Sequence, residues 1–461
     1  MCLYYGQTLI NMDKISHFEK DKIPKLLARY SVPAIIAMVV QALYNIAARV
    51  FIGYSSVGND GISALTANFP LILIFVAFGM LFGIGGSAAF SIALGEKNKV
   101  KAEKIISGTL FLLVITLSLL TIIIQIFAPK ILTLFGASEN ILQLSLDYGR
   151  ILIAFSVINS SAYAMNNFIR AQGSAKTAML SMVVGGVLSI ILFYIFIFIF
   201  KWGIKGIAVA TVISQAVTGI IVFSYLFGKK SYIKIKAKNL IPSFDIIKAI
   251  VSIGLAQFSI QLLTSLTNAL LNNQLQKYGG DEALSLMGMI FSFTQILFMP
   301  VLGINQGSMP IMGYNYGAKK YERVIHTVYA AIAAATFIMT TGFVITRLFP
   351  EQILLAFGKQ SDEIIDKGVI AIKIFFSMSC LIGFQITASG MFQAIGKPLL
   401  SIIMTISRQL IFLIPLAYIL PAFFRLNGIW LSIAASDLLA TIVTMFVFFR
   451  KIRLLRKKSV I

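Results

Sequence analysis

The sequence predicts an all-α membrane protein with twelve transmembrane helices in two pseudo-symmetric six-helix lobes. Hydrophobic residues make up 58% of the 461 residues and charged residues 12%, whereas soluble domains have about 45–50% and about 25%. Apolar runs follow one another along the chain, each of about 20 residues, the length that a helix needs to cross the hydrocarbon core. The third observation is an internal repeat whose interval is almost half of the chain.

The repeat is clearest where two apolar runs end in a Gly-containing turn followed by basic residues. These segments are Gly83–Lys104 and Gly303–Arg323, in which Gly95 corresponds to Gly317 and Lys97 to Lys319, 222 positions later. Six spans is an even number, so both copies enter the membrane from the same side. Repeats of this parallel kind are related by an axis along the membrane normal.

The twelve predicted spans alternate with short polar segments. They cover about residues 30–52, 63–93, 105–127, 147–169, 177–199, 206–227, 249–275, 284–312, 325–348, 367–391, 399–420 and 428–449. The predicted organisation is therefore a tail at 1–29, an N-terminal lobe at 30–228, an inter-lobe loop at 229–248, a C-terminal lobe at 249–449 and a basic tail at 450–461.

The charge distribution predicts the orientation of these spans. The net charge is +22, and 27 of the 39 Lys and Arg residues fall in alternate segments that include both termini. By the positive-inside rule both termini are cytoplasmic in a multi-pass protein of the cell inner or plasma membrane. This placement explains the basic charge without nucleic acid as a partner. The only cysteines, Cys2 and Cys380, and the isolated His17 and His326 predict no disulfide, metal site or cofactor.

The chain contains five long motifs: YNIAARVFIGYS, RAQGSAKTAMLSMVVGGVLSIIL, KGIAVATVISQ, MPIMGYNYGAKKYERV and SRQLIFLIPLAYILP. These motifs resemble the multidrug and toxic compound extrusion (MATE) family, and most of all its MepA-like bacterial subgroup. The resemblance runs from about Ile23 to Arg453.

The resemblance implies a transporter and not an enzyme. It implies a V-shaped bundle of two lobes that exports amphipathic, often cationic, small molecules by alternating access, in exchange for Na⁺ or H⁺. The expected partners are these small molecules and the lipid bilayer, and the expected state is a monomer.

The sequence departs from the family pattern at the acids that the resemblance would assign to ion coupling. One acid would align with Ala48 and a second with Phe193, and no Asp or Glu lies between Asp245 and Asp281. The coupling ion is therefore open. Two alternatives to a coupled exporter remain, an uncoupled facilitator and a flippase for lipid-linked precursors from the same superfamily.

One acid, Asp437, lies deep in a predicted span. It is about ten residues, or roughly 15 Å, from the outer end of its span. Arg408 lies about as far from the inner end of the preceding span. In a core of about 30 Å these depths coincide, so the two side chains are predicted to pair. The pair either pins two helices together or carries the coupling ion on Asp437, with Arg408 tuning its affinity.

Uncharged polar residues within the spans are candidates for a substrate cavity. Five lie on one predicted face of the seventh span, at helical spacings: Gln257, Gln261, Ser265, Asn268 and Asn272. Further candidates lie on the first, fourth and tenth spans: Gln41, Asn45, Asn159, Tyr163 and Gln385. Because amides facing lipid are unfavourable, these side chains either line a water-filled cavity or form hydrogen bonds between helices.

Overall fold

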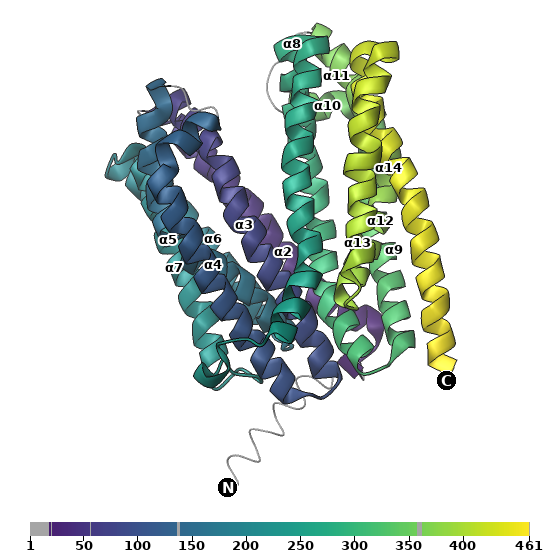
Figure 1. Cartoon of the computed structure of the whole chain (residues 1–461). Coiled ribbons are helices and arrows are strands. Elements are labelled where there is room, and N and C mark those ends of the chain that lie inside the picture. The colour runs from purple at the N-terminus through teal and green to yellow at the C-terminus, as the bar shows by residue number, and fades with distance from the viewer. Residues whose placement is uncertain (1–17, 20, 56, 136–138, 357–361, 461) are drawn as a thin grey trace. The chain divides into compact units, whose positions relative to one another are not determined.

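The computed structural model describes residues 18–19, 21–55, 57–135, 139–356 and 362–460, and within these ranges the chain is almost entirely helical (Figure 1). The first half contains α2 (Ile23–Gly53), α3 (Gly58–Gly95), α4 (Lys99–Leu134), α5 (Glu139–Ala171), α6 (Ala175–Tyr194), η1 (Ile195–Ile199) and α7 (Gly203–Phe227). The second half contains α8 (Phe244–Gly317), α9 (Tyr321–Leu348), α10 (Pro350–Leu355), α11 (Asp362–Phe375), η3 (Phe376–Met378), α12 (Ser379–Ala394), α13 (Pro398–Ile406), η4 (Ser407–Leu413) and α14 (Ile414–Val460). The predicted all-α class is confirmed.

The described residues contain 11 helical segments that are long and apolar enough to cross a membrane. The last one, Pro398–Lys458, has 61 residues, which is about 90 Å of helix for a core of about 30 Å. It is broken at Arg425, where φ is 48° and ψ is −131°. The segment therefore holds two crossings, which brings the total to the predicted twelve.

By their internal contacts the residues form two compact units. Unit 1 includes Ile36–Phe258, and unit 2 includes Lys22–Ile35 and Ser259–Ile461. The beginning of α2 thus packs with the second half of the chain, and the beginning of α8 packs with the first half. The lobe boundaries predicted from the sequence differ from these units at the two helix starts.

Glycines explain why the helix starts pack in this way. In unit 2, a Cβ on Gly307 would lie 2.6 Å from Ser31 Cα, and one on Gly303 would lie 2.7 Å from Ile35 Cα. Any larger residue at either position would push α2 and α8 apart. In unit 1, Gly254 of α8 approaches the backbone of Leu81 in α3 equally closely.

The backbone also repeats at the predicted interval. Lys97 follows α3 with φ of 57°, and Lys319 follows α8 with φ of 58°, both in the left-handed region. Non-glycine residues seldom adopt this conformation. Its occurrence in two turns 222 positions apart indicates that both halves use the same turn between helices.

Candidate functional site

The pair predicted from membrane depth is present in unit 2. Arg408 Nε donates a hydrogen bond of 2.6 Å to Asp437 Oδ1. The Asp437 side chain is only 2% exposed, whereas the Arg408 side chain keeps 26% of its surface exposed. A buried carboxylate needs a partner of this kind, because removing one member leaves an uncompensated charge.

Arg408 lies in a π-helical segment, η4, rather than in regular α-helix. A π-helix turns its side chains relative to an α-helical register, and such segments are often found at functional sites. The next residue, Gln409, donates through Nε2 to Thr264 Oγ1 of α8 at 2.9 Å. Its Oε1 is buried and accepts no hydrogen bond within the described residues. The segment that holds the arginine is therefore tied to α8 on one side and faces Asp437 on the other.

This arrangement can exchange a cation in one simple way. In the observed geometry the negative Asp437 is neutralised by Arg408. A proton or Na⁺ that bound the carboxylate would replace Arg408 as its partner and would leave the guanidinium to form other contacts. The partial exposure of Arg408 gives it room for that change.

The two N-terminal positions where the resemblance would place coupling acids lie in an apolar environment. Ala48 is 8% exposed and Phe193 is 1% exposed, and both belong to one hydrophobic cluster. Ile52, Ile204 and Ile207 are buried in the same cluster. The apolar members of this cluster offer a cation no ligand, and Tyr148, which belongs to it, interacts electrostatically with Tyr44 and Arg49.

A polar group in unit 1 brings several predicted residues together. Tyr44 of α2 interacts through its hydroxyl with the side chains of Gln41 and Gln215, and Tyr163 of α5 is close enough to act on it electrostatically. Gln41 and Tyr163 were predicted as cavity residues. Tyr44 and Gln215 were not, although Gln215 occupies the position in the repeat that corresponds to Asp437.

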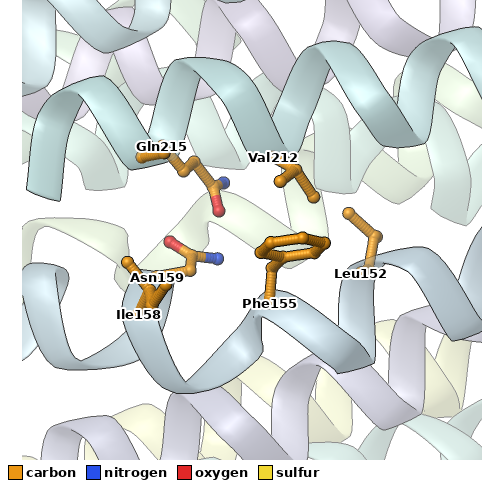
Figure 2. Close-up of a pocket in the computed structure, with 7 residues that line it drawn as sticks. Leu152, Phe155, Ile158, Asn159, Val212 and Gln215 are labelled. Carbon is orange, nitrogen blue, oxygen red and sulfur yellow. The ribbon is translucent and has the colours of Figure 1, made fainter.

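Gln215 also lines a small, shallow pocket between α5 and α7 that opens to the surroundings. Figure 2 shows the amides of Asn159 and Gln215 pointing toward one another, with Phe155 beside them. The lining residues are Leu152, Phe155, Ile158, Asn159, Val212, Gln215 and Ala216. The pocket combines an apolar wall with two uncharged hydrogen-bonding groups, Asn159 and Gln215.

The polar face predicted for the seventh span lies along α8. Gln257, Gln261 and Asn268 are half-buried and Asn272 is exposed. The side chain of Ser265 lies outside the described part of the structure. Gln257 belongs to unit 1 and the other residues to unit 2. Intermediate exposure is compatible with both predicted roles of these amides, the lining of a cavity and hydrogen bonding between helices.

The remaining candidates lie apart from these groups. Asn45 is exposed on α2. Gln385 of α12 is 6% exposed, and its Nε2 is buried without a hydrogen-bond partner among the described residues. Within those residues no three His, Cys, Asp or Glu side chains gather closely enough to hold a metal ion.

Comparison with known proteins gives a consistent result. A family model described as MatE matches residues 33–195 and again residues 257–419, well over half of the chain, and its two matches mirror the internal repeat. "Multidrug export protein MepA" of Staphylococcus haemolyticus (strain JCSC1435) is 25% identical over 437 residues, which cover 95% of this chain and 96% of the relative. The protein of the same name from Staphylococcus aureus (strain MSSA476) is 27% identical over 444 residues, with 96% and 97% coverage.

Solved structures agree with these relatives. One described as the outward-facing conformation of a multidrug resistance MATE family transporter of the MOP superfamily superimposes with a TM-score of 0.90 at 28% identity, covering 96% of this chain and 98% of that chain. Another, a MOP superfamily transporter from Pyrococcus furiosus, has the same TM-score and identity, with 95% and 98% coverage. Its description states that the reverse polarity of its binding pocket suggests a different function.

Proposed function

Because the chain belongs to the MATE family of multidrug efflux transporters, we propose that it exports amphipathic, cationic small molecules in exchange for H⁺ or Na⁺, with Asp437 as the coupling group. The protein acts in the plasma membrane, with both termini in the cytoplasm. The family consists of transporters and not of enzymes, so no catalytic residue or cofactor enters the proposal.

The single observation that carries the coupling proposal is the ion pair between Arg408 and Asp437. Asp437 is almost fully buried within a span and is held by one hydrogen bond from an arginine that is partly exposed. An ionised carboxylate at this depth is costly and is rarely retained without a role in a transport pathway. The apolar cluster around Ala48 and Phe193 argues against the first lobe as the place of coupling.

Polar but uncharged side chains are the proposed substrate contacts. In unit 1 these are Gln41, Tyr44, Asn159, Tyr163 and Gln215, which combine amides with phenol rings. In unit 2 they are Gln261, Asn268, Asn272 and Gln385. Amides and aromatic rings bind cations and neutral groups without a fixed counter-charge, which suits a transporter of varied compounds.

Transport in proteoliposomes tests the proposal. The vesicles hold a cationic dye, and an H⁺ or Na⁺ gradient is imposed across their membrane. One of the two gradients is expected to drive dye movement in the unchanged protein and to lose this effect in Asp437→Asn. If Asp437→Asn keeps its full response to the gradient, Asp437 is not the coupling group.

Two other functions correspond to distinct outcomes of the same assay. Dye movement that is indifferent to both gradients supports an uncoupled facilitator, the function favoured by the apolar cluster around Ala48 and Phe193. An absence of dye movement supports a flippase for lipid-linked precursors. This alternative is included because a different function is suggested for a MOP superfamily transporter that is 28% identical to this chain.

A further inference from the structure

The segment between α7 and α8, residues 229–243 and called the strap here, is strongly basic. It contains five lysines and no acid: Lys229, Lys230, Lys234, Lys236 and Lys238. All five side chains are exposed. The strap belongs to unit 1 together with α7 and the beginning of α8.

The strap is held against unit 1 by specific contacts. Gln172, at the end of α5, is fully buried, and its Oε1 accepts hydrogen bonds from Ser231 Oγ at 2.9 Å, Tyr232 N at 2.8 Å and Ile233 N at 3.0 Å. Farther along, the backbone N–H of Lys236 donates to Ser107 Oγ at 3.1 Å. The lysines are therefore presented on a fixed backbone rather than on a loose loop.

The pattern of burial separates two faces of the strap. Ile233 is 2% exposed and Ile235 is 8% exposed. The residues that follow each of them, Lys234 and Lys236, are exposed. This alternation is typical of an extended segment that lies on a surface. Lys236 pairs with Glu103 of α4 at 2.7 Å, and Lys99 lies over the ring of Tyr232. The charges of Lys230, Lys234 and Lys238 point outward.

Large apolar side chains are exposed at the end of the strap. Ile241 is 81% exposed, and Phe244, the first residue of α8, is 76% exposed. Pro242 between them packs closely against Gly108 of α4, which holds this end in place. Exposed isoleucine and phenylalanine next to lysines match surfaces that lie at the boundary between lipid headgroups and acyl chains.

We propose that the strap binds anionic phospholipid. The phosphates of the headgroups contact the outward lysines, and Ile241 and Phe244 enter the acyl-chain boundary. The strap begins directly after the span of α7 and ends at the span of α8, so it lies at headgroup level. A soluble anion would satisfy the lysines but would leave the two apolar side chains in water, and for that reason a lipid is the occupant that fits both features.

Tryptophan quenching by brominated lipids tests this site directly. Phe244→Trp is placed in nanodiscs that contain brominated phosphatidylglycerol or brominated phosphatidylcholine, and the signal of Trp202 and Trp430 is subtracted with the unsubstituted protein. We expect Trp at position 244 to prefer phosphatidylglycerol by about fivefold or more, the factor that one lysine near an anionic surface supplies. The assay needs no transport, so its failure is distinct from a failure of the proposed function.

Two matched controls locate the effect. Ile220→Trp carries the same reporter on α7, at a position that is 65% exposed and has no lysine within eight residues of it in the sequence, and is expected to show no lipid preference. In the Phe244→Trp background, Lys230→Gln, Lys234→Gln and Lys238→Gln together are expected to abolish the preference. Removing three exposed lysines elsewhere, with Lys130→Gln, Lys201→Gln and Lys277→Gln, is expected to preserve it.

Three results would overturn the proposal. The first is equal quenching by the two lipids at position 244. The second is a preference for phosphatidylglycerol that survives the loss of Lys230, Lys234 and Lys238. The third is a preference that millimolar inorganic phosphate removes, because the site would then hold a soluble anion.

Discussion

Asp437→Asn removes the charge from the most deeply buried acid of the described residues while preserving the shape of its side chain. The change leaves Arg408 without its anion, at a place where Asp437 is 2% exposed. Breaking a buried ion pair by removing one partner costs about 3–5 kcal/mol. Because Arg408 keeps 26% of its side chain exposed, the low end of that range, about 3 kcal/mol, is expected.

A second variant separates the structural role of the pair from coupling. Arg408→Gln together with Asp437→Asn removes both charges and leaves two side chains that can hydrogen-bond to each other. The free energy of unfolding of the double variant is expected to lie within about 1 kcal/mol of that of the unchanged protein, because an uncharged pair carries no buried charge that lacks a partner. If Asp437 carries the coupling ion, the double variant is folded but its dye transport no longer responds to either gradient.

The free energy of unfolding and the response of dye transport to a gradient can be measured on the same preparations. Unfolding by SDS in mixed micelles gives the free energies for the two single variants and the double variant, and hence the coupling energy between the residues. Asp147→Asn serves as the control, since Asp147 pairs with the exposed Lys205 at 3.2 Å and such surface pairs contribute less than about 1 kcal/mol. A double variant that regains gradient-driven transport would refute the coupling role and leave Arg408 and Asp437 as a structural pin.

Three further predictions concern the scaffold, the first lobe and the strap. Gly307→Ala places a Cβ 2.6 Å from Ser31 Cα and is expected to lower the free energy of unfolding in SDS by about 1–3 kcal/mol. Gly288→Ala, with no atom within 4 Å of its Cβ, is expected to leave that free energy unchanged. Ala48→Asp buries a carboxyl group next to apolar side chains. It is expected to lower the free energy of unfolding by about 2–3 kcal/mol without adding a response to Na⁺, and a gain of Na⁺-driven transport would contradict this. Gln172→Ala removes the acceptor of three hydrogen bonds and is expected to speed trypsin cleavage in the strap about tenfold. Gln143→Ala removes an exposed amide elsewhere in unit 1 and is expected to leave the cleavage rate unchanged; equal rates for both variants would show that Gln172 does not hold the strap.

The spans and one long-range contact were predictable because the membrane fixes depth. A span of about 20 residues sets where each side chain lies along the membrane normal, and Arg408 and Asp437 have matching depths on consecutive spans. Depth alone, however, leaves the rotation of a helix open. The contact of Tyr44 with Gln215 depends on the faces that α2 and α7 turn toward each other, which no single span encodes.

Two glycines four positions apart permit a close approach of another helix, but the sequence does not identify that helix. Gly303 and Gly307 are spaced as expected for a tight helix contact, and the structure places both against the start of α2. At the repeat interval of 222, Gly307 corresponds to Gly85, which approaches the backbone of Ile250 in α8, and Gly303 corresponds to Leu81, whose backbone Gly254 of α8 approaches. The assignment of residues 22–35 to unit 2 follows from these contacts, and it required knowledge of which helix lies opposite the glycines.

The two halves of the chain share a turn conformation between helices but differ in the polar side chains at corresponding positions within the spans. Lys97 and Lys319 keep the same left-handed turn, because a change of φ there would redirect the following helix. Gln215 and Asp437 occupy corresponding positions, yet one contacts Tyr44 and the other is paired with an arginine. A buried amide needs only a hydrogen-bond partner, whereas a buried carboxylate also needs a counter-charge, and Arg408 supplies it in the second half alone. Under the proposed coupling role, the second half therefore holds the group that would exchange an ion, and the corresponding position of the first half holds an uncharged side chain.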